Sequence, residues 1–87
     1  MQKTVNQKLK ILHLEDLPSD AELVEIELKK SSIQFELLVV DYREEFEKAL
    51  REFNPDIILS DHSLPSFSSI DALRIVKNLG IRVPFIL

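Results

Sequence analysis

The stretch from Leu9 to Asp16 reads LKILHLED, and it indicates how the chain begins to fold. Its apolar residues make a short, nearly continuous run: Leu9, Ile11, Leu12 and Leu14. Such a run is typical of a strand that is buried on both faces of a parallel sheet. The run stops at Glu15 and Asp16, so two acids stand at the carboxyl end of the expected strand.

Helix signals follow at short intervals. Helix starts are indicated where a capping residue stands three positions before an acid: Ser19 with Glu22, Asp41 with Glu44, and Ser68 with Asp71. The expected apolar faces consist of Ala21, Val24 and Leu28 widened by Leu23 and Ile26, then Phe46, Ala49, Leu50 and Phe53, then Ile70, Leu73 and Val76. Asn54-Pro55 predicts the end of the second helix, and Gly80 is expected as the C′ residue of the third.

Three more strands are expected between and after these helices. Residues 33–40 begin with alternating apolar and polar residues, which is typical of an edge strand with one solvated face. Residues 57–59 form a buried-type run that ends at Ser60-Asp61, and residues 83–87 begin a fourth strand. The order β-α-β-α-β-α-β predicts an α/β fold with a doubly wound parallel sheet.

Composition excludes several classes of protein. The chain has 87 residues, a formal net charge of -4, no cysteine and one glycine, Gly80. Glycine-rich phosphate loops, the GxSxG nucleophile elbow, thiolate zinc sites and disulfides are therefore excluded. The basic residues are scattered, so we expect no nucleic-acid binding, and no apolar run approaches the length of a membrane helix, about 18 residues. Residues 1–8 are expected as a polar tail without a signal core, and the protein as cytoplasmic.

Acidic residues end two of the expected strands. In doubly wound sheets, ligands bind beyond the carboxyl ends of the strands, where Glu15, Asp16 and Asp61 would converge. Converging carboxylates repel one another unless a cation neutralises them, and Mg²⁺ prefers such oxygen ligands. An Asp carboxylate can also act as a nucleophile towards phosphorus. The pattern is typical of metal-assisted phosphoryl transfer to Asp, although Asp16 and Asp61 are also common as ordinary polar residues of loops and helix entries.

Two motifs resemble those of response-regulator receiver domains of two-component signal transduction. Leu9 to Asp16 is similar to their first strand and acidic pair, and Asp61 to Pro65 (DHSLP) to their phospho-acceptor loop, Asp-x-x-Leu/Met-Pro. The expected α-β-α-β segment fills the gap between the motifs, as such a domain requires. Glu15 to Leu23 (EDLPSDAEL) further resembles receivers that are attached to, or work with, sensor histidine kinases. The resemblance covers residues 9–87 and implies a flavodoxin-like receiver topology.

The resemblance also implies a role for each matching residue. Asp61 would accept a phosphoryl group from a histidine kinase or phosphotransfer protein in a Mg²⁺-dependent reaction of a phosphorelay. Asp16 and Asp61 would bind the Mg²⁺, Glu15 would act through bound water, Ser63 would offer its backbone carbonyl, and Pro65 would shape the loop. Such a protein is mainly a signalling module that catalyses its own aspartyl phosphorylation and dephosphorylation.

Receivers of this kind continue beyond a fourth strand, with a Ser or Thr at its end and a Lys after the fifth. Neither is present, so we expect residues 9–87 to lack the C-terminal third of a receiver. The family also often has a glycine where Ser69 stands. Residues 83–87 are apolar and would leave a bare strand edge, which predicts a homodimer or a domain swap through the fourth strand.

Two other functions stay open. One is a receiver-like interaction module that binds partners without phosphorylation. The other is a phosphoaspartyl phosphatase-type hydrolase, which ranks last because His62 and Ser63 follow Asp61 where such enzymes have an Asp-x-Asp motif. We expect His62 to be an ordinary loop residue and His13 to serve in strand packing. Three phenylalanines are expected in or near the core: Phe46, Phe53 and Phe67.

Overall fold

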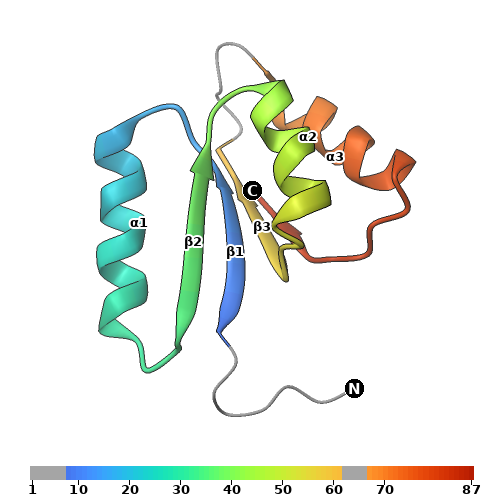
Figure 1. Cartoon of the computed structure of the whole chain (residues 1–87). Coiled ribbons are helices and arrows are strands. Elements are labelled where there is room, and N and C mark those ends of the chain that lie inside the picture. Colours follow the sequence, from blue (N-terminus) through green and yellow to red (C-terminus); the bar gives the residue numbers. More distant parts are fainter. Residues whose placement is uncertain (1–7, 62–66) are drawn as a thin grey trace.

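The computed structural model describes residues 8–61 and 67–87, where strands and helices alternate (Figure 1). In chain order these are β1 (Leu9–Leu14), α1 (Pro18–Lys30), β2 (Phe35–Val40), α2 (Arg43–Glu52), β3 (Ile57–Ser60), α3 (Ser69–Asn78) and β4 (Phe85–Ile86). The predicted α/β class and the predicted order of elements are confirmed.

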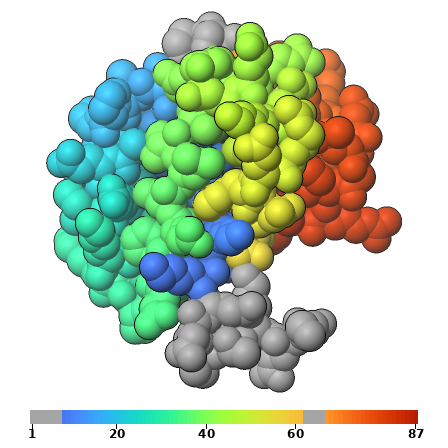
Figure 2. Space-filling view, viewed as in Figure 1, coloured from blue at the N-terminus to red at the C-terminus, as the bar shows by residue number. Residues whose placement is uncertain are grey.

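The described strands form one parallel sheet with the order β2-β1-β3-β4. The chain moves in one direction from β1 to β2 and in the other to β3 and β4. Right-handed crossovers then place α1 on one face of the sheet and α2 with α3 on the other (Figure 1). This arrangement is consistent with a flavodoxin-like fold. The predicted edge position of β2 is confirmed, and its side chains reach the surface between α1 and α2 (Figure 2).

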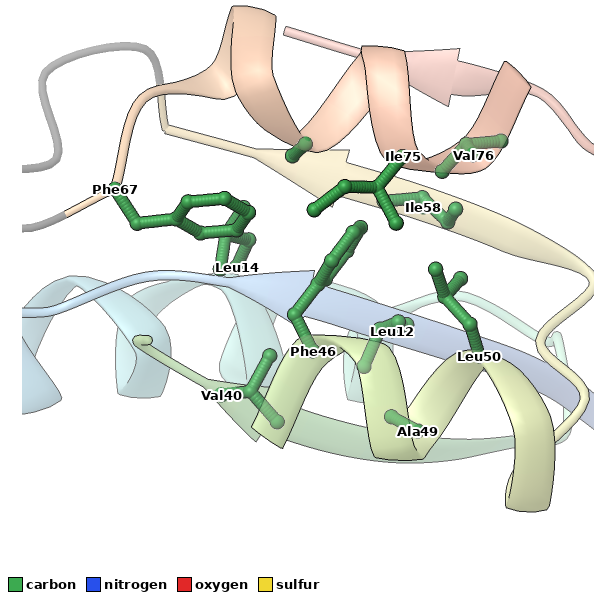
Figure 3. Packing of buried hydrophobic residues seen from close by; sticks show 11 residues of the cluster. Leu12, Leu14, Val40, Phe46, Ala49, Leu50, Ile58, Phe67, Ile75 and Val76 are labelled. Atoms are coloured by element: carbon green, nitrogen blue, oxygen red, sulfur yellow. The ribbon is translucent and has the colours of Figure 1, made fainter. Parts of the chain in front are cut away.

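The main hydrophobic core lies between the sheet and helices α2 and α3 (Figure 3). Phe46 is fully buried, and its ring centroid lies 5.7 Å from that of Phe67 in a tilted pair. The other fully buried side chains of largest volume come from the sheet: Leu12, Leu14 and Ile58. The predicted face of α2 is confirmed, since Ala49 and Leu50 are also buried and Phe53 packs at the edge of the cluster. Each large side chain buried here contributes about 1.5–3 kcal/mol.

The other face of the sheet has a thinner apolar cover, because among the described elements only α1 lies on it (Figure 1). Ala21 is buried, whereas Val24 and Leu28 are half-buried. Leu23 is 61% exposed and Ile26 is 42% exposed, so the expectation that they widen the buried face is wrong. A single helix meets a sheet along a narrow stripe, and these two side chains lie outside it.

Helix starts agree with the predictions in one case of three. The Ser68 side chain accepts a hydrogen bond from the Asp71 N–H at 3.1 Å, which confirms the cap of α3. Ser19 is not a cap, because α1 already begins at Pro18 with Leu17 as its N-cap. Proline is pre-organised for the first helical position, which moves the N-cap two residues earlier, from Ser19 to Leu17. The prediction that Asp41 caps α2 is also wrong.

The N-cap of α2 is Tyr42, which makes no side-chain capping bond. The N–H of Asp41 instead donates to the Glu45 side chain at 3.4 Å. At the other end, Asn54 has a positive φ of 53° and directly precedes Pro55, which confirms the predicted end of the helix. A short polar residue tolerates this left-handed conformation better than most.

Helix α3 is rotated relative to the prediction. Its buried residues are Ser69, Ala72, Ile75 and Val76. Ile70 is 60% exposed, so it does not belong to the buried face, and Leu73 is half-buried. The predicted C′ glycine is confirmed: Gly80 has a φ of 71° and donates to Lys77 O, while Ile81 donates to Val76 O. These two bonds form a Schellman motif.

Two strands are shorter than predicted. Ile33 lies before β2 and is exposed, and β4 comprises Phe85–Ile86 within the expected range 83–87. None of the helices in the described ranges is both long enough and apolar enough to cross a membrane.

Candidate metal centre

The ends of β1 and β3 place two acids side by side. Leu14 pairs with Ser60 in the parallel register, so the next positions along the strands are Glu15 and Asp61. Backbone hydrogen bonds extend the ladder through both: the Glu15 N–H donates to Val40 O at 2.9 Å, and the Asp61 N–H donates to Leu14 O at 3.0 Å. The backbone that carries these acids is therefore held by the sheet.

The position is also the topological switch point of the sheet. The chain leaves β1 for β2 on one side, while β3 lies on the other side of β1. In open α/β sheets, the connections diverge at such a point and leave room for a ligand at the carboxyl ends of the strands. Asp16 follows Glu15 in the turn that leads into α1.

The expected convergence of the three acids is observed. Glu15, Asp16 and Asp61 each offer one carboxylate oxygen, and these oxygens all lie within 4.8 Å of one another. Glu15 is buried, whereas Asp16 and Asp61 are half-buried, so the group opens to solvent on one side. An all-carboxylate donor set at this spacing fits a hard divalent cation, which completes its shell with water. The acidic triad, as we call these three residues, can therefore bind a metal ion.

Glu15 is the buried member of the triad, and its surroundings act on its pKa. Burial raises its pKa, and the Asp61 carboxylate, a hydrogen bond with Asp61 and the charge of Asp20 raise it further. The N–H of Leu17 opposes this effect, because it donates to Glu15 Oε2 at 3.2 Å. A bound cation would also act against the rise in pKa, because it favours the ionised form of the carboxylate.

His13 lies directly beneath the triad on the same face of β1. It is 4% exposed, and its Nε2 lies 3.9 Å from Glu15 Oε1. Burial lowers the pKa of His13, and the negative charge of Asp61 only partly offsets this effect, so the net effect favours the neutral imidazole. The expected burial of His13 in the strand is confirmed, and its proximity to Glu15 was not predicted.

Further acids surround the triad. A shallow pocket beside it is lined by Glu15, Asp16, Glu22, Glu25, Asp41 and Glu45, together with apolar residues of α1 and β2. Such a concentration of negative charge attracts cations to this edge of the sheet and disfavours the approach of anions when no cation is bound. The sequence analysis did not foresee this pocket, since its residues come from separate elements.

The remaining expected site residues follow Asp61 in the sequence. Ser63, expected to offer its carbonyl to the metal, and Pro65, expected to shape the loop, lie outside the described residues, as does His62.

The signal that could have identified His13 as a neighbour of the triad was in the sequence. Residues two apart on a strand point to the same face, which places His13 with Glu15.

Comparison with known proteins leaves the triad as the principal evidence on function: no protein-family model and no curated protein matches this chain.

Proposed function

We propose that the chain is a receiver domain with flavodoxin-like topology that takes up a phosphoryl group on Asp61 in a Mg²⁺-dependent phosphorelay. The observation that carries the proposal is the convergence of three carboxylates at the ends of the neighbouring strands β1 and β3. The resemblance of the two motifs to receiver domains supplies the reaction. A cytoplasmic location and a histidine kinase or phosphotransfer partner are parts of the same proposal.

Asp61 is the proposed nucleophile because its backbone is held by the sheet while its side chain is only half-buried. One carboxylate oxygen forms a bond to phosphorus as the bond between phosphorus and a histidine nitrogen of the donor breaks. That nitrogen keeps the electron pair and takes up a proton. The product is an aspartyl phosphate, a known form of covalent phosphoryl transfer.

Asp16 and Asp61 would hold the Mg²⁺, with Glu15 acting through bound water. A bound Mg²⁺ neutralises negative charge on a transferred phosphoryl group. The need for it is strong at this edge, because the surrounding acids otherwise repel an anionic donor. Ser63 and Pro65 keep the roles that the resemblance implies, as metal-binding carbonyl and loop-shaping residue.

The test is phosphorylation of the full-length protein by a small phosphodonor such as acetyl phosphate, followed by intact-mass spectrometry. We expect one phosphoryl group to be added with Mg²⁺ and none with EDTA. Asp61→Asn should abolish labelling, and Asp16→Asn should shift the Mg²⁺ dependence to higher concentration. Glu27→Gln, an exposed acid of α1 outside the acidic pocket, is the matched control and should label normally.

Labelling that persists in Asp61→Asn would contradict the acceptor assignment. No labelling of the wild type by acetyl phosphate or by any histidine kinase would favour the interaction module, in which the receiver-like fold binds partners without phosphorylation.

A further inference from the structure

His13 has an unusual environment for a histidine in a β-strand. Its side chain is 5% exposed, and its Nδ1 is buried without a hydrogen-bond partner among the described residues. Burying a polar atom without a hydrogen-bond partner costs free energy. An apolar residue would pack at this position without that cost, so packing alone does not explain why a histidine is found here.

The other ring nitrogen faces the acidic triad. Nε2 lies 3.9 Å from Glu15 Oε1, which is longer than a hydrogen bond and leaves no room for a water molecule between them. In a neutral imidazole only one nitrogen carries a proton. We assign that proton to Nε2, because Nε2 faces Glu15 Oε1, an acceptor, whereas Nδ1 has no hydrogen-bond partner among the described residues.

Glu15 is thereby approached by a donor on each oxygen. The Leu17 N–H donates to Oε2 at 3.2 Å, and His13 Nε2 faces Oε1. Hydrogen bonds on both oxygens would fix the rotation of the carboxylate about its last side-chain bond, and the Leu17 bond is already formed. A movement of roughly 1 Å would turn the His13 contact into a full hydrogen bond of about 2.9 Å.

We propose that His13 is a positioning residue, which orients the Glu15 carboxylate so that the triad binds a divalent cation. The inference rests on the proposed function, since it concerns the same cation site. Partners behind metal-binding carboxylates and histidines commonly change metal affinity by about 10–100-fold when they are removed. The role is distinct from ligation, because His13 is not among the residues whose ligand atoms meet within 4.8 Å.

The experiment measures binding of Mn²⁺ alone, and of Mg²⁺ alone, by isothermal titration calorimetry on the full chain. His13→Phe keeps a planar ring and removes the donor, and we expect it to weaken Mn²⁺ binding about tenfold. His13→Gln carries an amide nitrogen close to the place of Nε2 and should restore most of the affinity. His13→Asn has a shorter side chain that cannot reach Glu15, and it should bind as weakly as the Phe variant.

Ile11→Val is the matched control. Ile11 is 2% exposed and lies on the same strand and face as His13, two residues further from the triad. It should unfold at a slightly lower temperature and still bind Mn²⁺ like the wild type. If His13→Phe does not fold, the difference between the Gln and Asn variants decides the matter, because both place an amide in the same site.

The possible results separate this inference from the proposed function. Equal affinity of the Gln and Asn variants, or wild-type affinity in a folded His13→Phe protein, overturns the role of His13. If, in that case, Asp16→Asn still loses Mn²⁺ binding, the proposed cation site is supported although the role of His13 is not. A wild type that binds neither Mn²⁺ nor Mg²⁺ overturns the site and the role of His13 together.

Discussion

The mutual repulsion of the triad should be measurable as stability. Asp61→Asn removes one charge, keeps the size of the side chain and retains groups that can hydrogen bond with Glu15. The carboxylate oxygens of the triad lie within 4.8 Å of one another. At that separation two unit charges repel by about 3.5 kcal/mol at an effective dielectric of 20 and by about 0.9 kcal/mol in bulk water. Because Asp61 is half-buried, we expect a gain of about 1–3 kcal/mol in the free energy of unfolding without divalent cations.

For a domain of this size, such a gain raises Tm by at least about 4 °C. The assay is differential scanning calorimetry in EDTA at mildly alkaline pH, which favours ionised carboxylates, with Glu27→Gln as the control for net charge. Added Mg²⁺ should raise the Tm of the wild type more than that of the variant, because the wild type binds it better. An unchanged or lowered Tm of Asp61→Asn relative to the control would refute the reasoning that the three charges are in close contact.

Other predictions follow from single residues. The pKa of His13 is lower in the folded chain, so the unfolded chain takes up a proton at a higher pH. The free energy of unfolding should therefore fall as pH drops through 6.5 towards the lower folded-state pKa. Urea unfolding across this range should show that His13→Phe removes that dependence. The pH dependence from Glu15 has the opposite sign, because its raised pKa favours the protonated form in the folded chain. Its contribution to the free energy of unfolding is present below pH 4.5 and is lost as pH rises through the folded-state pKa. Glu15→Gln should flatten this part of a urea-unfolding profile. Gly80→Ala should cost about 1 kcal/mol in thermal unfolding, because the φ of 71° strains any side chain although no atom lies within 4 Å of the added Cβ. Ile86 is 47% exposed on an edge strand of the described sheet, so we expect the 87-residue chain to self-associate and Ile86→Lys to weaken this in light scattering; concentration-independent monomers of the wild type would contradict it.

The strands β1 and β3 and their carboxyl ends were predictable from sequence because their signals are local. Continuous apolar runs that stop at acids identify β1 and β3, and the parallel register then brings Glu15 and Asp61 together without further information. The Schellman end of α3 at Gly80 was predictable for the same reason, since only glycine enters the left-handed region without strain.

The buried faces of α1 and α3 were less predictable, because each helix has apolar residues on more than one side. In α3 both Ile70 and Ile75 have helical spacing to apolar neighbours, and packing against the sheet selects the side that carries the small Ala72. In α1 the sheet face is covered by one described helix, so Leu23 stays exposed although its spacing suits a buried residue. Such choices depend on neighbours that are distant in sequence.

The contact between His13 and Glu15 could not be predicted from sequence for a different reason. Strand alternation places the two side chains on one face. The 3.9 Å separation, and the lack of a hydrogen-bond partner for Nδ1 among the described residues, depend instead on the packing around the ring. Sequence spacing alone favours a packing role for a histidine between leucines.

The most direct measurement of the central claim is the location of the phosphoryl group. After reaction with acetyl phosphate and Mg²⁺, borohydride reduces an aspartyl phosphate to homoserine, and peptide mass spectrometry then finds the altered residue. We predict homoserine at Asp61 in the wild type, and none when Mg²⁺ is omitted. Homoserine at another aspartate, or its complete absence after reaction with an active phosphodonor, would contradict the account.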